Sequence, residues 1–154
     1  MAFYQLIKTQ KLPVTISEIW NFISAPDNLK EITPEKMGFI VTSNTGTKKM
    51  YPGMIITYKI HPILGIPVNW ATEITHVEDY KYFVDEQRFG PYKFWHHQHK
   101  FYEIKGGVEM VDILHYKVGF GFIGKIMNTI VVRSQLEQIF SYRFNKLEEM
   151  FGKL

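Results

Sequence analysis

Hydrophobic and polar positions alternate with two different periods along the chain. In residues 3–11 and through most of residues 38–116, large apolar side chains recur at every second position, which is typical of β-strands with one buried face. From about residue 125, apolar residues recur at steps of three and four, which is the period of an amphipathic helix. The pattern predicts a sheet that is followed by a long C-terminal helix.

Turn residues divide the alternating segments into about seven strands. Pro13 ends the first strand because proline has no N–H for the ladder, and Gly90–Pro91 marks a later turn. Consecutive strands joined by short turns form an antiparallel sheet. The predicted strands are Phe3–Lys11, Gly38–Ser43, Met54–Ile60, Val68–Val77, Tyr80–Phe89 and the two arms of a Trp95–Tyr116 hairpin that turns at Lys105–Gly106–Gly107.

Three helices are predicted beside this sheet. Ser17 is a suitable N-cap for a short helix that ends at Ile23, and Pro26 begins a second one that ends near Ile32. A third helix, from about Lys125 to Phe151, is roughly 40 Å long at about 1.5 Å per residue. It has to lie across the sheet, so we expect one α+β domain over residues 1–154 with a space between sheet and helix. The predicted inner stripe of the long helix is Ile126, Ile130, Leu136, Phe140, Phe144, Leu147 and Phe151.

Three segments show neither the strand period nor the helix period, and we predict that they are connections. Asn44–Thr47 reads as a turn. His61–Pro67 is apolar but interrupted by two prolines and a glycine, so it either covers a cavity mouth or packs onto the core. Gly119–Gly124 has the glycine spacing of a dinucleotide-binding loop, but no βαβ unit surrounds it, so it reads as a flexible lead into the last helix.

The Trp95–Tyr116 hairpin contains the most informative group of side chains. Residues two apart share a face of a strand. The set predicted to face inward is Trp95, His97, His99 and Phe101, whereas residues 96, 98 and 100 are polar and face outward. Two imidazoles set among large aromatics are typical of a ligand cavity rather than of a dry core.

Other polar residues are expected close to these histidines. Asp112 lies across the hairpin, and Asp85 and Gln87 lie on the preceding strand. A carboxylate in a cavity needs a cation or hydrogen-bond donors, which the histidines can supply. Arg133 lies within the predicted inner stripe of the long helix. It either faces the sheet, where it pairs with a carboxylate or contacts an acidic ligand head group, or extends its side chain to solvent.

The His97-x-His99 pair has several interpretations. With a carboxylate opposite, two imidazoles on one face can bind zinc or another divalent metal. Imidazole also has the intrinsic pKa for proton transfer. Alternatively, histidines that are satisfied by carboxylates form the polar floor of a pocket, or they are exposed if the predicted facing is wrong. The sequence favours the polar floor, with no metal and no cofactor.

Aromatic side chains are predicted to form the apolar wall of this cavity. The chain is 16% aromatic, which provides much rigid apolar surface. The alternative is that the same side chains fill a core. The predicted lining is Trp70, Phe83, Phe89, Trp95, Phe101 and Tyr116 from the sheet, and Phe140 and Phe144 from the helix.

Composition and charge exclude several other functions. The absence of cysteine excludes disulfides, thiolate metal sites and cysteine nucleophiles. A formal charge of +3 with dispersed basic residues does not indicate nucleic-acid binding. No stretch reaches the roughly 18 apolar residues of a membrane span, and no signal-peptide pattern occurs at the N-terminus. We therefore expect a cytoplasmic protein.

One set of residues, together with the order of elements, matches a known family. These residues are Phe83–Gln87, Gly90–Pro91, Trp95–Phe101, Gly106–Gly107, Asp112, Tyr116 and Phe120–Gly124, with Trp70 and Ile74 upstream. On these residues, and over essentially its whole length, the chain resembles the START-like or Bet v 1-like superfamily, also called SRPBCC. The resemblance implies a helix-grip fold and a ligand cavity, most similar to bacterial ligand-binding proteins related to polyketide cyclase/dehydrase-like and coenzyme Q-binding-like domains. The superfamily includes lipid and hormone binders, cyclases and hydratases, so it restricts the activity only weakly.

These observations lead to three hypotheses about function. The first is a binding protein for a small hydrophobic molecule, lipid-like or aromatic, held between the sheet and the long helix. The second is a cyclase- or dehydratase-type enzyme that uses His97 or His99 with Asp112 or Asp85 as acid and base. The third is an interaction module that docks through Ile63–Pro67 and Phe120–Ile123. A homodimer is compatible with each of them.

Overall fold

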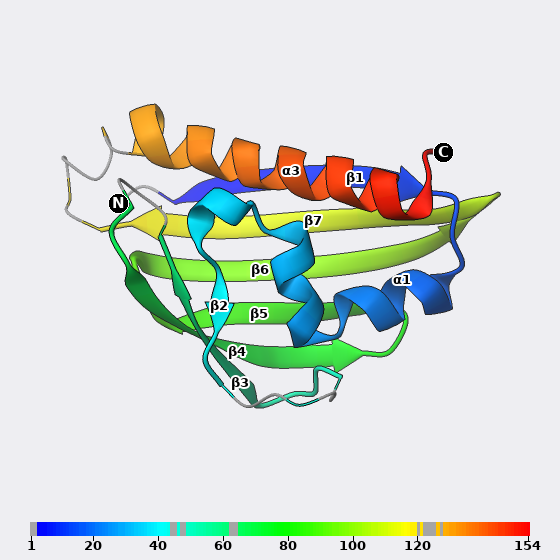
Figure 1. Cartoon of the computed structure of the whole chain (residues 1–154), viewed down its shortest axis with the longest axis horizontal. Helices are drawn as coiled ribbons and strands as arrows, with labels where there is room; N and C mark the ends of the chain where they lie inside the picture. Colours follow the sequence, from blue (N-terminus) through cyan, green and yellow to red (C-terminus); the bar gives the residue numbers. More distant parts are fainter. Residues whose placement is uncertain are drawn as a thin grey trace.

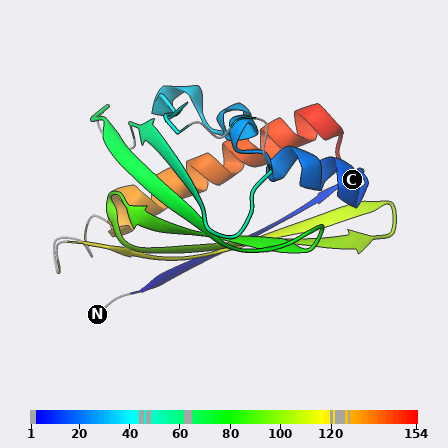
Figure 2. The ribbon, with the colours of Figure 1, turned by 90° about the horizontal axis from the view of Figure 1, so that it is seen from below.

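The chain forms a curved antiparallel sheet with its helices on the concave face (Figures 1 and 2). This computed structural model describes residues 3–43, 46, 49–61, 65–119, 121, 126 and 128–154. The strand order is β1-β7-β6-β5-β4-β3-β2, so only β1 and β7 are neighbours that are not consecutive in the chain. The predicted α+β fold, with seven antiparallel strands and a long C-terminal helix, is confirmed.

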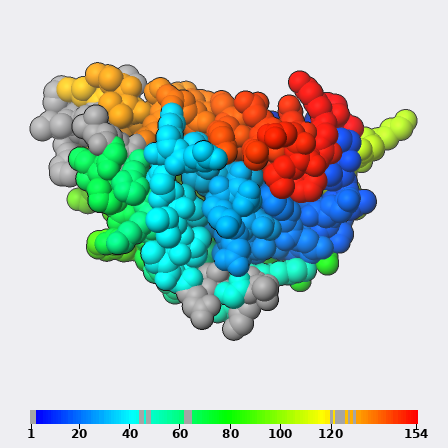
Figure 3. Space-filling model, viewed as in Figure 1, coloured from blue at the N-terminus to red at the C-terminus, as the bar shows by residue number. Residues whose placement is uncertain are grey.

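The elements follow the predicted order. In Figure 1, α3 lies along β1 and β7, and α1 and η1 lie in front of the middle strands; the space-filling view shows these helical segments covering the centre of the sheet (Figure 3). No helix within the described ranges is both long and apolar enough to cross a membrane. The strands are β1 (Tyr4–Leu12), β2 (Ile40–Val41), β3 (Met54–Ile60), β4 (Val68–Glu78), β5 (Tyr82–Phe89), β6 (Tyr92–Ile104) and β7 (Gly107–Val118). The helices are α1 (Ile16–Ile23), the 3-10 helices η1 (Pro26–Ile32) and η2 (Glu35–Met37), the π-helix η3 (Asn128–Val132) and α3 (Arg133–Phe151).

The first short helix begins before the predicted position. Its N-cap is Thr15, whose Oγ1 accepts a hydrogen bond from the Glu18 N–H at 3.3 Å, while the Thr15 N–H donates to Glu18 Oε2 at 2.9 Å. This reciprocal capping box satisfies two donors at once. Ser17 therefore lies inside the helix, and its prediction as the N-cap is wrong. The threonine–glutamate pair at a spacing of three is the signal that identifies the cap.

A β-bulge reverses the facing of the last residue of β5. Ala71 of β4 pairs with Phe89, but the next residue, Thr72, pairs with Gln87, so Arg88 is an extra residue in the ladder. One extra residue moves the following side chain to the opposite face. Phe89 is consequently 65% exposed, and its predicted place in the aromatic wall is wrong.

The C-terminal helical segment changes its periodicity near its start. A π-helix, η3, precedes α3, whereas a continuous α-helix from Lys125 was expected. A π turn takes up more residues than an α turn, so the buried positions there advance in steps of four. Ile126 and Ile130 are exposed in consequence, and their assignment to the inner stripe is wrong. The buried positions are Asn128, Val132, Leu136, Phe140 and Leu147.

Trp20 of α1 anchors the short helices to the sheet. Its ring lies 5.3 Å from that of Phe101 and 6.0 Å from that of Phe83, both in edge-on orientation. All three side chains are buried, and aromatic pairs of this geometry add stability beyond the area they bury. This cluster closes one end of the space between sheet and helices, so Phe101 belongs to the core.

The hairpin between β6 and β7 turns as predicted. Gly106 has φ of +84°, a conformation that glycine adopts without strain. At Gly107, a Cβ atom would lie 2.0 Å from the carbonyl oxygen of Leu12. Glycine is therefore required there because the end of β1 passes directly against the turn.

Three predicted connections lie partly or wholly outside the described residues. They are the Asn44–Thr47 turn, the His61–Pro67 loop and the Gly119–Gly124 segment, in each of which several positions are not described. The docking edge of the third functional hypothesis falls largely on these positions. It therefore stays a prediction.

Phe101 and Phe89 allow a matched test of the strand facing. Phe101→Ala should lower the free energy of unfolding by about 3–5 kcal/mol because it leaves a cavity beneath Trp20, whereas Phe89→Ala should change it by no more than about 0.5 kcal/mol. Urea unfolding of both variants measures the difference. Equal losses would contradict the bulge at Arg88 and the outward facing of Phe89.

Candidate functional site

A cavity of about 150 Å³ lies between the sheet and the helices. Strands β3 to β6 form one side, and η1 and α3 form the other. Most of its wall is apolar, and its polar groups gather on β5, β6 and α3. Its lining side chains with a polar or charged group include Tyr58, Trp70, Asp85, Trp95, His97, His99 and Arg143.

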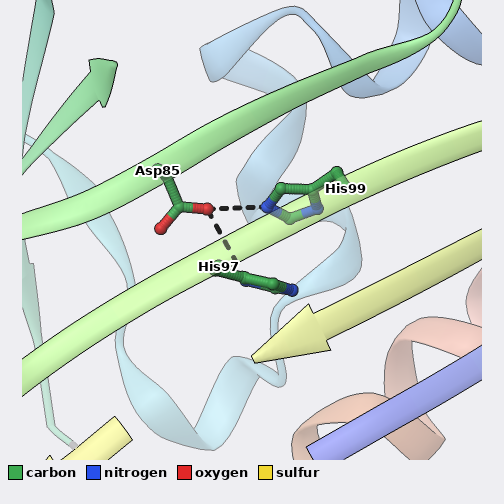
Figure 4. A group of neighbouring side chains, drawn as sticks. All are labelled: Asp85, His97 and His99. Carbon is green, nitrogen blue, oxygen red and sulfur yellow. Dashed lines mark hydrogen bonds and ion pairs between the residues drawn. The ribbon is translucent and has the colours of Figure 1, made fainter. Parts of the chain in front are cut away.

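Two carboxylates and two imidazoles alternate in a closed ring at one side of this cavity. Asp112 Oδ1 lies 3.0 Å from His97 Nε2 and 2.9 Å from His99 Nδ1. On the opposite side of the rings, Asp85 Oδ2 lies 3.5 Å from His97 Nδ1 and 2.6 Å from His99 Nε2. Figure 4 shows the Asp85 carboxylate pointing at both histidines, whose rings are 3.8 Å apart.

The register of three adjacent strands assembles this ring. Asp85 of β5 pairs with His97 of β6, and Asp112 of β7 pairs with His99 of β6. Directly opposed residues of antiparallel strands have their Cβ atoms about 5 Å apart. The predicted inward facing of His97 and His99 is confirmed, since both are buried. The prediction that Asp112 approaches them across the hairpin is confirmed as well.

Two further side chains hold the carboxylates in place. The Trp95 indole Nε1–H donates to Asp85 Oδ1 at 3.0 Å, which leaves Oδ2 directed at the histidines. Arg143 of α3 places Nη1 3.8 Å from Asp112 Oδ1, and its guanidinium lies 5.4 Å from the centre of the Phe140 ring. The helix therefore contributes a positive charge on the far side of Asp112.

Burial and mutual contacts shift the pKa values of this group in different directions. Burial opposes ionisation of both carboxyls, but hydrogen bonds from the histidines outweigh it and hold the pKa of Asp112 and that of Asp85 below the usual range. For His99, burial lowers the pKa, but hydrogen bonds to Asp112 and Asp85 raise it above its ordinary value. For His97, burial and the charge of His99 lower the pKa. This environment therefore favours the protonated form of His99 and the neutral form of His97.

Six of the predicted site residues line the cavity, and the others lie behind it or away from it. Asp112 lies behind the two histidines, Phe140 packs its ring 5.8 Å from that of His97, and Phe101 lies under Trp20. The six that line the cavity are Trp70, Phe83, Asp85, Trp95, His97 and His99.

Gln87 and Tyr116 have structural contacts rather than a place on the cavity wall. The Gln87 amide bonds to the backbone of Tyr92 in both directions, at 2.6 Å and 3.1 Å, and so closes the turn from β5 to β6. Tyr116 is buried against the ring of Tyr4 at 5.5 Å, beneath the N-terminal half of α3. Burial raises the pKa of Tyr116.

The arginine that approaches the cluster is not the predicted one. Arg133 is the first residue of α3 and is exposed. Of the two predicted orientations, its side chain therefore adopts the one toward solvent. Arg143 instead pairs with Asp112. It lies three residues after Phe140 and four before Leu147, so helical periodicity places it on the inner face and is the signal that identifies it.

Two tyrosines of the cavity were not predicted. Tyr58 follows Met54 and Ile56 at a spacing of two, so strand alternation identifies it. Tyr92 precedes Trp95 by three, which would put the two on opposite faces of a regular strand. A register shift between Tyr92 and Phe94 brings both into the cavity, and the sequence contains no clear sign of it.

Two hydrogen-bond donors at the cavity have no partner among the described residues. They are the Trp70 Nε1–H and the Arg143 Nε–H. A buried donor without an acceptor costs about 1–3 kcal/mol. Both residues line the cavity.

An outer groove of about 420 Å³ adjoins the cavity between η2 and the start of α3. Met37, Gln135 and Ile139 line both spaces, so these three side chains form the boundary between the groove and the cavity.

Solved structures that share this fold have low sequence identity to the chain. CV1439 from Chromobacterium violaceum is 8% identical, with a TM-score of 0.73 over 98% of this chain and 99% of its own. Ginseng major latex-like protein 151 from Panax ginseng is 10% identical, with a TM-score of 0.68 over 97% of both chains, and Ara h 8.0201 is 11% identical, with a TM-score of 0.64 over 97% of both.

The chain has the helix-grip fold, which it shares with these Bet v 1-like structures. The resemblance inferred from the sequence is thereby confirmed at the level of the fold. Comparison with protein-family models gives no match. A search of curated proteins gives no match either. The function of this helix-grip chain therefore has to be argued from its own cavity.

Arg143 and Arg133 provide a matched test of the inner face of α3. Arg143→Gln should lower the free energy of unfolding by about 1–3 kcal/mol because Asp112 loses its nearby cation. Arg133→Gln should stay within about 0.5 kcal/mol of the unsubstituted protein. Chemical denaturation measures both, and a larger loss for Arg133→Gln would contradict the assignment of Arg143 to the cluster.

Proposed function

We propose that this protein binds a small molecule with an apolar body and at least one hydrogen-bond acceptor in the cavity between the sheet and α3. The observation that carries the proposal is an apolar cavity with the unpartnered Trp70 Nε1–H at its wall. The helix-grip architecture supports it, because the curved sheet and the helix enclose a space rather than packing flat on each other. Self-association and a cytoplasmic location stay predictions.

The size of the cavity restricts the ligand. Pockets for drug-sized ligands are about 300–1,000 Å³, whereas this cavity has a volume of about 150 Å³. A space of this size suits a single ring or a short branched chain. A longer ligand, such as a lipid chain, would have to extend past Met37 and Ile139 into the outer groove.

The walls of the cavity determine where each part of the ligand lies. Trp70, Trp95 and Tyr92 pack against one another with ring centres 4.8–5.5 Å apart, which makes a rigid aromatic surface for a flat apolar group. Asp85 and the histidines form the polar side. An acceptor oxygen that reaches the Trp70 and Arg143 donors fixes the orientation of the ligand.

A ligand that is bound in the cell should remain bound during gentle purification. Native mass spectrometry of the protein, followed by solvent extraction and mass analysis of the extract, should reveal a small compound with a carbonyl, carboxyl or other acceptor group. A wholly apolar hydrocarbon as the sole extracted compound would contradict the proposed polar contact.

Acetophenone and ethylbenzene are matched probes for the polar contact, since they differ by one carbonyl oxygen. Acetophenone should bind more tightly by about 0.5–1.5 kcal/mol, or roughly two- to tenfold, because its oxygen accepts a hydrogen bond from a buried donor. Trp70→Phe should remove this advantage. Trp20→Phe, the same substitution in a buried tryptophan outside the cavity, should preserve it. Isothermal titration calorimetry measures each affinity, and an unchanged ratio in Trp70→Phe would rule out the Trp70 contact.

An acid–base enzyme is a second candidate, favoured by one specific contact. His99 Nε2 and Asp85 Oδ2 are 2.6 Å apart, and both residues line the cavity. A positioned imidazole–carboxylate pair that a substrate can reach is the arrangement that general acid–base catalysis requires. Incubation of the extracted compound with the protein and with His99→Gln would distinguish the two: an enzyme alters the compound and loses that activity in the variant, whereas a binding protein returns the compound unchanged.

A further inference from the structure

We propose that Asp85, His97 and His99 bind a divalent transition-metal ion such as Zn²⁺, with one coordination position open to the cavity. The ligand atoms would be Asp85 Oδ2, His97 Nδ1 and His99 Nε2. Within the described part of the chain, these residues offer ligand atoms that all lie within 4.8 Å of one another. The inference does not depend on the identity of the small molecule.

The first step of the argument is the position of the ring protons. Asp112 Oδ1 lies within hydrogen-bond distance of His97 Nε2 and of His99 Nδ1. An ionised carboxylate only accepts hydrogen bonds, so both of these nitrogens carry protons. In a neutral imidazole the other nitrogen has a lone pair. Asp112 therefore directs the lone pairs of His97 Nδ1 and His99 Nε2 to the opposite side.

The second step is the convergence of electron-rich atoms on that side. His97 Nδ1 and His99 Nε2 both face Asp85 Oδ2, at 3.5 Å and 2.6 Å (Figure 4). A proton on His99 satisfies the shorter contact but leaves His97 Nδ1 facing a carboxylate oxygen. One cation between the three atoms satisfies all of them. The 2.6 Å contact has to lengthen slightly, since ligands at about 2.0–2.2 Å from zinc are more than 3 Å apart in a tetrahedral site.

The third step is the support behind the ligands. Metal-binding histidines usually donate their second ring N–H to a carboxylate, which fixes the orientation of the ring. Asp112 provides this contact for both histidines at once. The Trp95 N–H holds Asp85 Oδ1 at 3.0 Å and so orients Oδ2 toward the histidines. Each of the three ligands thus has a second contact that positions it.

Charge and access agree with a divalent ion. When both histidines are neutral, Asp85 and Asp112 carry two negative charges and Arg143 carries one positive charge nearby, so a divalent cation more than offsets the negative charge that remains. Two imidazoles and one carboxylate suit zinc, iron or cobalt better than calcium or magnesium. All three ligands also line the cavity, so the remaining coordination position faces the proposed small-molecule space. Three protein ligands and one open position are typical of reactive rather than structural metal sites.

The test uses the full chain without a histidine tag, after removal of metals with a chelator. Titration with Zn²⁺, followed by gel filtration and elemental analysis, should show a single retained ion per chain. Titration with Co²⁺ should produce the strong visible absorption of a tetrahedral site, and Zn²⁺ should displace it. Addition of the chelator should lower the thermal unfolding midpoint of the loaded protein.

Variants separate the proposed site from adventitious binding. His99→Gln and Asp85→Asn each remove one ligand and should abolish both the Co²⁺ absorption and the retained Zn²⁺. Asp112→Asn, which alters only a positioning contact, should weaken binding by about 10–100-fold. His96→Gln is the matched control. It lies on the other face of the same strand, where His96 approaches His115 and Glu86 and could form a surface site.

Each outcome decides the proposal. Loss of binding in His99→Gln and Asp85→Asn with retention in His96→Gln supports it, provided that circular dichroism shows all three folded. If His99→Gln does not fold, Asp85→Asn and the Co²⁺ spectrum of the unsubstituted protein decide. Absence of Co²⁺ absorption, or loss of the ion in His96→Gln alone, overturns it. None of these measurements uses a small molecule, so failure here leaves the proposed binding function standing.

Discussion

The acceptance of two imidazole N–H groups by one buried carboxylate, Asp112, is the constraint on which the polar site depends. A buried carboxylate is costly unless donors or cations surround it. Here the neighbours come from two elements: His97 and His99 from the adjacent strand β6, and Arg143 from the helix α3. The same contact fixes which nitrogen of each ring faces Asp85. Asp112 does not line the cavity, but it determines which histidine nitrogens face the cavity side of the cluster.

The fold stabilises this arrangement by placing it on interior strands of the sheet. Strands β5, β6 and β7 are neighbours, and none of them is an edge strand, so their registers are held on both sides. The aromatic cluster around Trp20 closes one end, and α3 covers the carboxylates from above. The space that remains is small and mostly apolar, with polar groups on one side. The proposed ligand binding, proton transfer and metal coordination would all use this polar side. Proton transfer would place a proton between Asp85 and a histidine, whereas metal coordination would place an ion there.

The predicted facing of side chains held along the regular parts of β6 and β7. The alternation of β6 placed His97 and His99 on the inner face, and pairing across a short turn brought Asp112 to them. Predictions were wrong where one residue disturbed the period. The bulge at Arg88 turned Phe89 outward, a shift before Phe94 brought Tyr92 inward, and the π turn left Ile130 exposed. Such irregularities depend on the neighbouring strand or helix, and period counting along a single segment does not detect them.

The sequence by itself determined the order of elements, the antiparallel sheet and the facing of the histidine strand, because these follow from local periodicity and turn residues. The resemblance to the helix-grip proteins came from particular residues and from the order of elements. Only the tertiary structure decided that Arg143 rather than Arg133 meets the cluster, that Phe101 and Gln87 serve the core and a turn, and how large the cavity is. It also decided the ring of alternating carboxylates and imidazoles, since the nitrogen that each histidine presents depends on the distances between strands. The sequence favoured a polar pocket floor over a metal site, because residue types and spacing do not reveal where ring protons lie.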